Sequence, residues 1–111
     1  NVEFVTGSPG GSRIISYTAQ SIVNLIDFGL DPQEAANVPH YMSRNGSTDL
    51  EPPTPGVTTD YDVQALADAL TARGHRVNVV EQSSGLSIIA VTDGGFIGGA
   101  DPRRDGTVGG R

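Results

Sequence analysis

A glycine-rich run near the start of the chain, Gly-Ser-Pro-Gly-Gly at positions 7–11, separates two segments of different pattern. Residues 2–6 form a short run typical of a β-strand. From Ser12 to Phe28 apolar residues recur at helical spacing, among them Ile15, Ile22 and Ile26, and Gly29 supplies a stop. The sequence therefore predicts a strand, a tight glycine turn and the longest helix, with the turn directly at the N-terminus of that helix.

Three kinds of role are compatible with such a turn. A helix N-terminus presents unpaired N–H groups and the positive end of the helix dipole, so it attracts negative charge. The consecutive glycines Gly10 and Gly11 would let a ligand approach the backbone closely. The turn could hold a phosphate, stabilise an oxyanion during acyl transfer, or serve packing alone. The absence of Lys weakens the phosphate interpretation, since phosphate loops of the Walker type use a lysine.

Further elements follow from local signals. Asp31 as N-cap, Pro32 at the first helical position and Glu34 three residues after the cap predict a short helix that reaches about Asn37 and ends before Pro39. Residues 40–57 read as an ordered loop around a short edge strand at residues 49–51. A third helix is expected after an N-cap at Thr59, with an apolar stripe and a stop at Gly74; the stripe consists of Val63, Leu66, Ala67 and Leu70.

The last third of the chain has β-type patterns. Residues 76–80 and 86–92 read as strands, and Asp93, Gly94 and Gly95 predict a hairpin turn into residues 96–99. The expected fold is α+β, a single domain over residues 1–111 in which helices pack on one face of a mainly antiparallel sheet.

Charge and composition exclude several partners. Seven Arg, no Lys and thirteen acidic residues give a net charge of −6, which argues against binding nucleic acid or an anionic membrane surface. The chain has no Cys, so disulfides and thiol chemistry are excluded, and no apolar stretch is long enough to span a membrane. Residues 1–6 do not resemble a signal peptide. An apolar fraction of 36% with 15 Gly predicts a thin core and suggests a partner.

Beyond these physical signals, residues 7–14 match a motif of bacterial γ-glutamyltranspeptidases, in which a strand ends in Gly-Ser-Pro-Gly-Gly and a long helix follows. Three later blocks, at residues 24–29, 34–39 and 98–103, arrive in the order of that family. The match extends over essentially the whole chain, so the chain resembles the C-terminal part of the small subunit of such an enzyme. The family often has Arg where this chain has His40, so any contact made by that Arg is in doubt here.

The resemblance implies an N-terminal nucleophile hydrolase with a four-layer αββα sandwich, made as a self-cleaving precursor. It implies that Gly10 and Gly11 form the oxyanion hole and contact the substrate through their N–H groups. The nucleophile of the family is a Thr at the start of the small subunit, and Asn1 is not that residue. The implied partners are the large subunit, the upstream part of the small subunit and a γ-glutamyl substrate such as glutathione. No cofactor and no metal are expected.

The implied activity is cleavage of γ-glutamyl amides through a γ-glutamyl-enzyme intermediate, with transfer of the acyl group to water or to amino acids. The 111-residue chain alone is expected to be inactive, and the parent enzyme to be periplasmic or extracellular, with the cytoplasm as the alternative. Two other functions stay open: a cephalosporin or glutaryl acylase of the same superfamily, and a non-enzymatic domain that binds an anion or a protein.

Six polar residues are given structural roles. His40 is interpreted as a surface or structural histidine, and His75, beside a helix stop, as a structural one. Asp101 and Arg103 are expected to form a turn held by a charge pair. Asp60 and Asp62 are interpreted as dipole partners in the first turn of the third helix.

Overall fold

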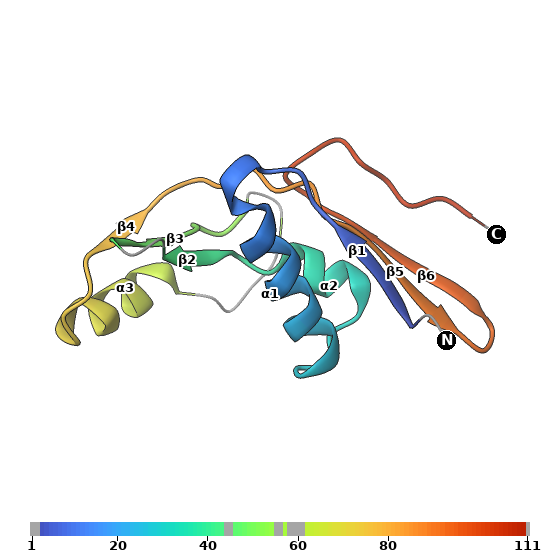
Figure 1. Ribbon diagram of the computed structural model, residues 1–111, viewed down its shortest axis with the longest axis horizontal. Coiled ribbons are helices and arrows are strands. Elements are labelled where there is room, and N and C mark those ends of the chain that lie inside the picture. Colours follow the sequence, from blue (N-terminus) through green and yellow to red (C-terminus); the bar gives the residue numbers. More distant parts are fainter. Residues whose placement is uncertain (1–2, 44–45, 55–56, 58–61, 111) are drawn as a thin grey trace. The chain divides into compact units, whose positions relative to one another are not determined.

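A computed structural model describes residues 3–43, 46–54, 57 and 62–110 of the chain. The chain divides into two compact units, Asn1–Val38 with Ser83–Arg111, and Pro39–Gln82. Among the described residues, the first unit combines two α-helices with a three-stranded sheet, and the second combines one α-helix with a three-stranded sheet (Figure 1). The α+β class expected from the sequence is confirmed, whereas the expectation of one domain stays a prediction.

The sheet of the first unit is antiparallel. It contains β1 (Phe4–Gly7), β5 (Ser87–Thr92) and β6 (Gly95–Ala100) in the order β1-β5-β6. Thr92 pairs with Gly95, so only Asp93 and Gly94 lie between the paired residues of the β5–β6 hairpin. The predicted hairpin is therefore confirmed. The N-terminal strand pairs with β5, which lies more than 80 residues away in the sequence.

The glycine turn leads into a short 3₁₀ turn, η1 (Gly11–Arg13), and then into α1 (Ile14–Ile26). Gly29 adopts a φ of 64°, which confirms the predicted helix stop. The face of α1 that is buried carries Tyr17, Ser21 and Leu25. The isoleucines that gave the helical pattern lie elsewhere: Ile15 and Ile26 are 83% and 61% exposed. The pattern thus predicted the helix but not the face that packs in this chain.

The second helix, α2 (Pro32–Asn37), begins as the sequence predicts. The Glu34 N–H donates to Asp31 Oδ1 at 2.8 Å, and the Asp31 N–H donates to Glu34 Oε1 at 3.1 Å. These two bonds form the expected capping box. Behind this start, Ala35 and Ala36 are buried, and their small side chains let α2 lie close to the sheet.

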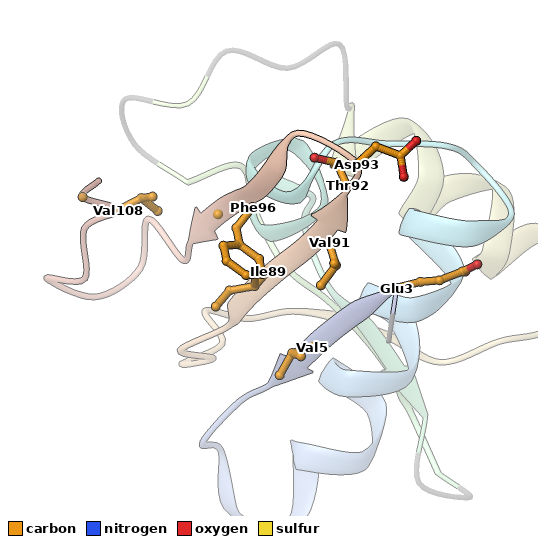
Figure 2. A pocket seen from close by; sticks show the side chains of 10 residues that line it. Glu3, Val5, Ile89, Val91, Thr92, Asp93, Phe96 and Val108 are labelled. Atoms are coloured by element: carbon orange, nitrogen blue, oxygen red, sulfur yellow. The ribbon is translucent and has the colours of Figure 1, made fainter. Parts of the chain in front are cut away.

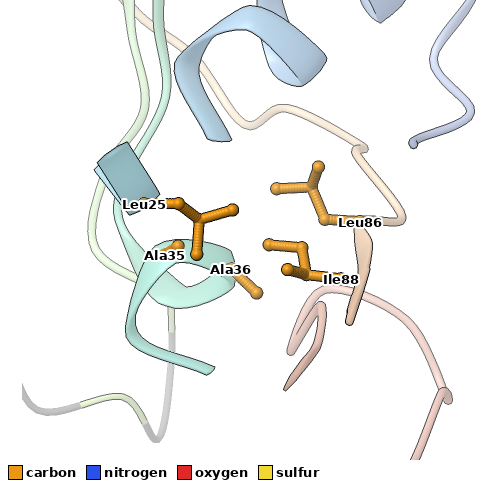
Figure 3. Close-up of a cluster of buried hydrophobic side chains, with 5 residues drawn as sticks. All are labelled: Leu25, Ala35, Ala36, Leu86 and Ile88. Carbon is orange, nitrogen blue, oxygen red and sulfur yellow. The ribbon is translucent and has the colours of Figure 1, made fainter. Parts of the chain in front are cut away.

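The core of the first unit lies between the helices and one face of the sheet, as Figure 3 shows. Along β5, Ile88 and Ala90 point into this core and are 1% and 8% exposed. The five fully packed members of the core are Leu25, Ala35, Ala36, Leu86 and Ile88.

The opposite face of the same sheet is apolar but exposed. The pairs Val5 with Ile89 and Val91 with Phe96 place these four side chains on one face. Figure 2 shows them around a shallow hollow. Phe96 is 79% exposed and Val5 is 55% exposed. A monomeric domain rarely leaves so continuous an apolar surface in water.

The second unit corrects the expectation of a single sheet, whereas most strand pairs of the described chain are antiparallel, as expected. It has its own sheet, in which β2 (Tyr41–Ser43) pairs antiparallel with β3 (Thr48–Leu50), and β3 pairs parallel with β4 (Val77–Val79). The strand β2 was not predicted, and the strands expected at 49–51 and 76–80 are shifted or shortened. A parallel pair needs a crossover connection, which the segment containing α3 (Val63–Ala72) supplies here.

The start of α3 is also corrected. Asp62, predicted to lie in the first helical turn, is the N-cap, and its side chain accepts a hydrogen bond from the Ala65 N–H at 3.0 Å. Asp is as good an N-cap as Thr, and position 62 lies directly before the apolar stripe. The predicted cap Thr59 and the predicted dipole partner Asp60 lie outside the described residues. No helix among the described residues is long and apolar enough to cross a membrane.

Gly99 in β6 permits a very close contact with α2. A Cβ atom at this position would lie 2.7 Å from Gln33 N and would also overlap the Pro32 carbonyl group. The side-chain amide of Gln33 binds the same strand: its Nε2 donates to Ala100 O at 2.8 Å, and its Oε1 accepts from the Ala100 N–H at 3.1 Å. This contact joins the first turn of α2 to the end of β6.

We predict that Gly99→Ala lowers the free energy of unfolding by about 1–3 kcal/mol, because α2 must move away from β6. Gly94→Ala is the control, since a Cβ there meets no atom within 4 Å. Urea unfolding of both variants checks this, and equal stabilities would contradict it.

Candidate functional site

The glycine loop adopts a conformation that only glycine takes easily. Gly10 has a φ of 146° and Gly11 a φ of 60°. The Gly10 carbonyl accepts from the Arg13 N–H at 3.1 Å, and the Gly11 carbonyl accepts from the Ile14 N–H, so both carbonyls point into the starting helix. The chain thereby turns from the end of β1 into η1 and α1.

The N–H groups of the same two glycines are the donors that this loop offers. Within the described part of the chain, no hydrogen-bond acceptor pairs with the Gly10 N–H or with the Gly11 N–H. They belong to the unpaired donors that every helix N-terminus leaves. The Gly10 carbonyl points into the starting helix, so the Gly11 N–H, which belongs to the same peptide plane, points away from it. The arrangement offers two adjacent donors to an electron-rich atom.

The two glycines differ in their surroundings. A Cβ at Gly10 would lie 2.6 Å from Cε2 of Tyr17, whose ring is 1% exposed. A Cβ at Gly11 would meet no atom within 4 Å. Gly10 is therefore held against the first turns of α1, whereas Gly11 faces open space.

This difference predicts unequal effects of alanine at the two positions. Gly10→Ala should lower the free energy of unfolding by about 2–5 kcal/mol, because it combines a clash with Tyr17 and a strained φ. Gly11→Ala should cost only about 1–2 kcal/mol, the ordinary cost of a left-handed residue. Urea unfolding measures both. A Gly11→Ala variant as unstable as Gly10→Ala would contradict the geometry.

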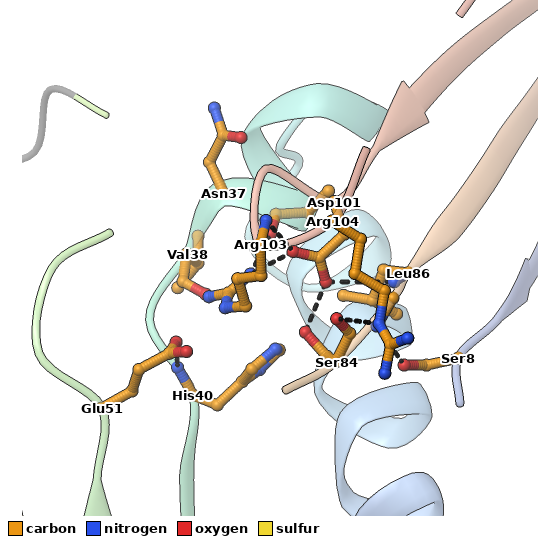
Figure 4. A network of polar contacts seen from close by, with 12 residues as sticks. Ser8, Asn37, Val38, His40, Glu51, Ser84, Leu86, Asp101, Arg103 and Arg104 are labelled. Carbon is orange, nitrogen blue, oxygen red and sulfur yellow. Dashed lines mark hydrogen bonds and ion pairs between the residues drawn. The ribbon is translucent and has the colours of Figure 1, made fainter. Parts of the chain in front are cut away.

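Apart from the glycine loop, a cluster of polar contacts around the Asp101 carboxylate holds the segment before β5. The Asp101 carboxylate accepts four hydrogen bonds (Figure 4). Ser84 Oγ and the Leu86 N–H donate to Oδ2, the latter at 3.0 Å. The Arg103 N–H and Arg103 Nη1 donate to Oδ1 at 3.0 and 2.8 Å. The expected turn with a charge pair is thus confirmed, and it is buried, with side-chain exposures of 6% for Arg103 and 1% for Asp101.

Arg103 extends this cluster to α2. Its Nη1 donates to Ala36 O at 2.8 Å and its Nη2 to Val38 O at 2.9 Å. Both carbonyls lie at the C-terminal end of α2, where a positive charge also interacts favourably with the helix dipole. Arg103 therefore ties the end of β6 to the end of α2.

The hydrogen bonds control the charge of Asp101. Burial alone would raise the pKa of its carboxyl group, but the bonds from Ser84, the Leu86 N–H and Arg103 together outweigh burial and hold the pKa below its usual 3.8. A pKa that is lower in the folded state means that the carboxylate stabilises the fold at pH values above 3.8. This contribution is lost as the pH falls below 3.8 through the folded-state pKa.

We predict that Asp101→Asn lowers the free energy of unfolding at pH 7 by about 3–5 kcal/mol, because it leaves the buried Arg103 without its counter-charge. The difference from the unsubstituted protein should shrink as the pH is lowered from 5 to below the folded-state pKa. Asp105→Asn, at an exposed position, is the control and should have little effect. Urea unfolding at several pH values checks this; a gap that is constant over that range would contradict it.

The two histidines lie far from the glycine loop in the sequence, and the backbone N–H of each takes part in a hydrogen bond of the fold. His40 is buried, so it is not a surface residue, which was one of the two alternatives expected for it. Its backbone N–H donates to Glu51 Oε1 at 2.9 Å. His75 is exposed, and its N–H donates to Leu70 O at 3.1 Å at the end of α3.

Two residues that connect the glycine loop to the Asp101 carboxylate, Ser8 and Gly85, were not predicted from the sequence. Ser8 Oγ accepts from the Gly85 N–H at 3.0 Å, and Gly85 lies between Ser84 and Leu86, which both donate to Asp101. The partners Ser8 and Gly85 are 77 residues apart, so no local pattern reveals the contact. The Ser-Gly pair at positions 84–85 was the one available signal, since it marks a turn.

Comparisons with known proteins agree with the motifs. The gamma-glutamyltranspeptidase family matches residues 1–110. The glutathione hydrolase proenzyme of Escherichia coli (strain K12) is 39% identical over 100 residues, which cover 89% of this chain and 16% of that protein. The acylase ACY 1 proenzyme of Pseudomonas sp. (strain SE83) is 38% identical over 108 residues, covering 96% of this chain and 18% of that protein.

A solved structure shows the same fold. The T380A mutant of Helicobacter pylori gamma-glutamyltranspeptidase superposes with a TM-score of 0.76 and 30% identity, covering 94% of this chain and 55% of that chain. The present chain spans less than a fifth of the length of the two curated relatives. With a family match over residues 1–110, the chain belongs to the γ-glutamyltranspeptidase family, whose members are N-terminal nucleophile hydrolases.

Proposed function

We propose that this chain is the C-terminal part of the small subunit of a γ-glutamyltranspeptidase and supplies its oxyanion hole. The complete enzyme would cleave γ-glutamyl amides such as glutathione through a γ-glutamyl-enzyme intermediate and pass the acyl group to water or to an amino acid. The observation that supports this most directly is the pair of unpaired N–H groups at Gly10 and Gly11, at the N-terminus of a helix.

The chemistry needs donors of this kind. When a hydroxyl attacks the γ-carbonyl carbon, the carbonyl oxygen becomes an oxyanion in a tetrahedral intermediate, and two fixed N–H groups stabilise it. Donors that are already oriented need no reorganisation during the reaction, and loss of one typically reduces the rate by about 10²- to 10³-fold. The open space beside Gly11 leaves room for the substrate to approach these donors.

The nucleophile in this proposal lies outside the 111 residues. By family resemblance it is a Thr whose free α-amino group acts as the base. The hydroxyl proton passes to that amine and then to the leaving amine of the substrate. The resulting ester is cleaved by water or by an amino acid, again through an oxyanion at Gly10 and Gly11.

The exposed apolar surfaces support the proposed partners, the large subunit and the upstream part of the small subunit. Val5, Ile89, Val91 and Phe96 cover the sheet face that no helix of the first unit packs on. In an αββα sandwich this is the face on which a second sheet packs.

An acylase is the second candidate function. The Pseudomonas acylase proenzyme is 38% identical to this chain, almost the same as the 39% of the glutathione hydrolase proenzyme. An oxyanion hole serves both reactions equally, because both pass through a tetrahedral intermediate. The two activities differ in whether the acyl group carries an α-amino group.

The test compares two chromogenic substrates that differ only in that amino group, γ-glutamyl-p-nitroanilide and glutaryl-p-nitroanilide. The complete self-cleaved protein should release p-nitroaniline from the first much faster than from the second. The 111-residue chain alone should release none from either, because it lacks the nucleophile.

Two other results of this comparison would contradict the proposed function. A preference for the glutaryl substrate would replace the proposal by the acylase. Absence of activity on both substrates, in protein that has cleaved itself, would contradict an acyl-transfer function and favour a domain that binds an anion or a protein.

A further inference from the structure

We infer that Ser8 is a positioning residue that sets the direction of the Gly10 N–H group. Its hydroxyl donates to the Pro9 carbonyl at 2.7 Å and accepts from the Gly85 N–H at 3.0 Å. This inference rests on the proposed oxyanion role of Gly10.

The link between Ser8 and the Gly10 N–H is the planarity of the peptide bond. The Pro9 carbonyl and the Gly10 N–H belong to one peptide unit, and no peptide bond in the described chain is cis. In a trans unit the C=O and the N–H point in opposite directions. A hydroxyl that holds the carbonyl oxygen on the Ser8 side therefore directs the N–H to the other side.

The proline leaves one rotation for the hydroxyl to control. The ring of Pro9 fixes its φ, and the residue before a proline is restricted to extended conformations. The orientation of the Pro9–Gly10 plane then depends on ψ of Pro9. The bond from Ser8 Oγ to Pro9 O closes a small ring around this torsion and restricts it.

The second donor is oriented without a side chain. The Gly10 carbonyl accepts from the Arg13 N–H at 3.1 Å, and this bond fixes the plane that contains the Gly11 N–H. Of the two N–H groups, only that of Gly10 depends on a side-chain hydroxyl, so removing the hydroxyl should affect one donor and spare the other.

Ser8 is itself held by well-packed surroundings. The residues on either side of Gly85 are bound to the buried Asp101 carboxylate. A Cβ at Gly85 would lie 2.8 Å from Cγ of Pro9 and 2.7 Å from Cδ of Arg104, so the Pro9 ring lies directly against this segment. Arg104 Nε also donates to Ser84 O at 3.2 Å. The hydroxyl therefore connects the loop to a fixed point of the fold.

The test uses the complete, self-cleaved protein with γ-glutamyl-p-nitroanilide and three variants. Ser8→Ala should lower kcat by about 10- to 100-fold, which is no more than the typical effect of removing one oxyanion donor. It should change KM by less than about twofold. Ser8→Thr keeps a hydroxyl and should restore kcat to within about threefold. Thr71→Ala is the matched control, since Thr71 Oγ1 also donates to a backbone carbonyl, that of Ala67 at 2.8 Å in α3. It should leave kcat unchanged.

A structural role alone predicts a different result, in which the unfolding midpoint falls and kcat per folded molecule does not. A kcat for Ser8→Ala equal to that of the unsubstituted protein would overturn the inference, as would a Ser8→Thr variant as slow as Ser8→Ala. If Ser8→Ala does not cleave itself, Gly85→Ala replaces it, because its Cβ would lie 2.8 Å from Cγ of Pro9 and would displace the Pro9 ring. Lower kcat with unchanged KM in that variant supports the inference, and unchanged kcat overturns it.

The unsubstituted protein separates this inference from the proposed function. If it releases no p-nitroaniline, the proposed function fails, and with it the basis of the inference. If it is active and Ser8→Ala is equally active, only the positioning role of Ser8 fails.

Discussion

The buried carboxylate of Asp101 joins three segments that are far apart in the sequence. It accepts hydrogen bonds from Ser84 and the Leu86 N–H before β5, and it pairs with Arg103, which in turn binds the last carbonyls of α2. A buried charge is tolerated only when its hydrogen bonds are complete, and four donors complete them here. The same contacts link the blocks at residues 34–39 and 98–103 in this chain, because Arg103 donates to the carbonyls of Ala36 and Val38.

From this fixed point the fold reaches the glycine loop through Gly85 and the Ser8 hydroxyl. The loop contributes no reactive side chain, only two backbone N–H groups whose carbonyl counterparts are held by Ser8 and Arg13. Such a site depends on orientation more than on residue chemistry, since a backbone donor is effective only if the surrounding structure fixes its direction in advance. The buried polar network and the proposed oxyanion hole are in this sense parts of one arrangement within the first unit.

Local signals in the sequence predicted local structure well. The capping box of Asp31 and Glu34, the stop at Gly29 and the Asp93-Gly94 turn depend on residues within a few positions of each other, and all three are confirmed. Pairings across long stretches of sequence were not predictable, which is why the second sheet with its parallel strands and the Ser8–Gly85 contact were missed. The cap at Asp62 is local, and it was missed because Thr59, three residues earlier, is also a good N-cap residue type. The exposed Ile15 and Ile26 show a further limit: helical spacing finds a helix, but a chain that packs against partners can bury another face. The proposed role of Gly10 and Gly11 came from the family motif, because the residues alone also allowed a phosphate site or a simple turn.

The most direct test of the central claim is a crystal structure of the complete protein with a γ-glutamyl inhibitor bound covalently to the nucleophile as a tetrahedral adduct. The account predicts that the adduct oxygen lies about 2.7–3.1 Å from both Gly10 N and Gly11 N. An adduct oxygen held by other donors, with both glycine nitrogens beyond hydrogen-bonding distance, would contradict it.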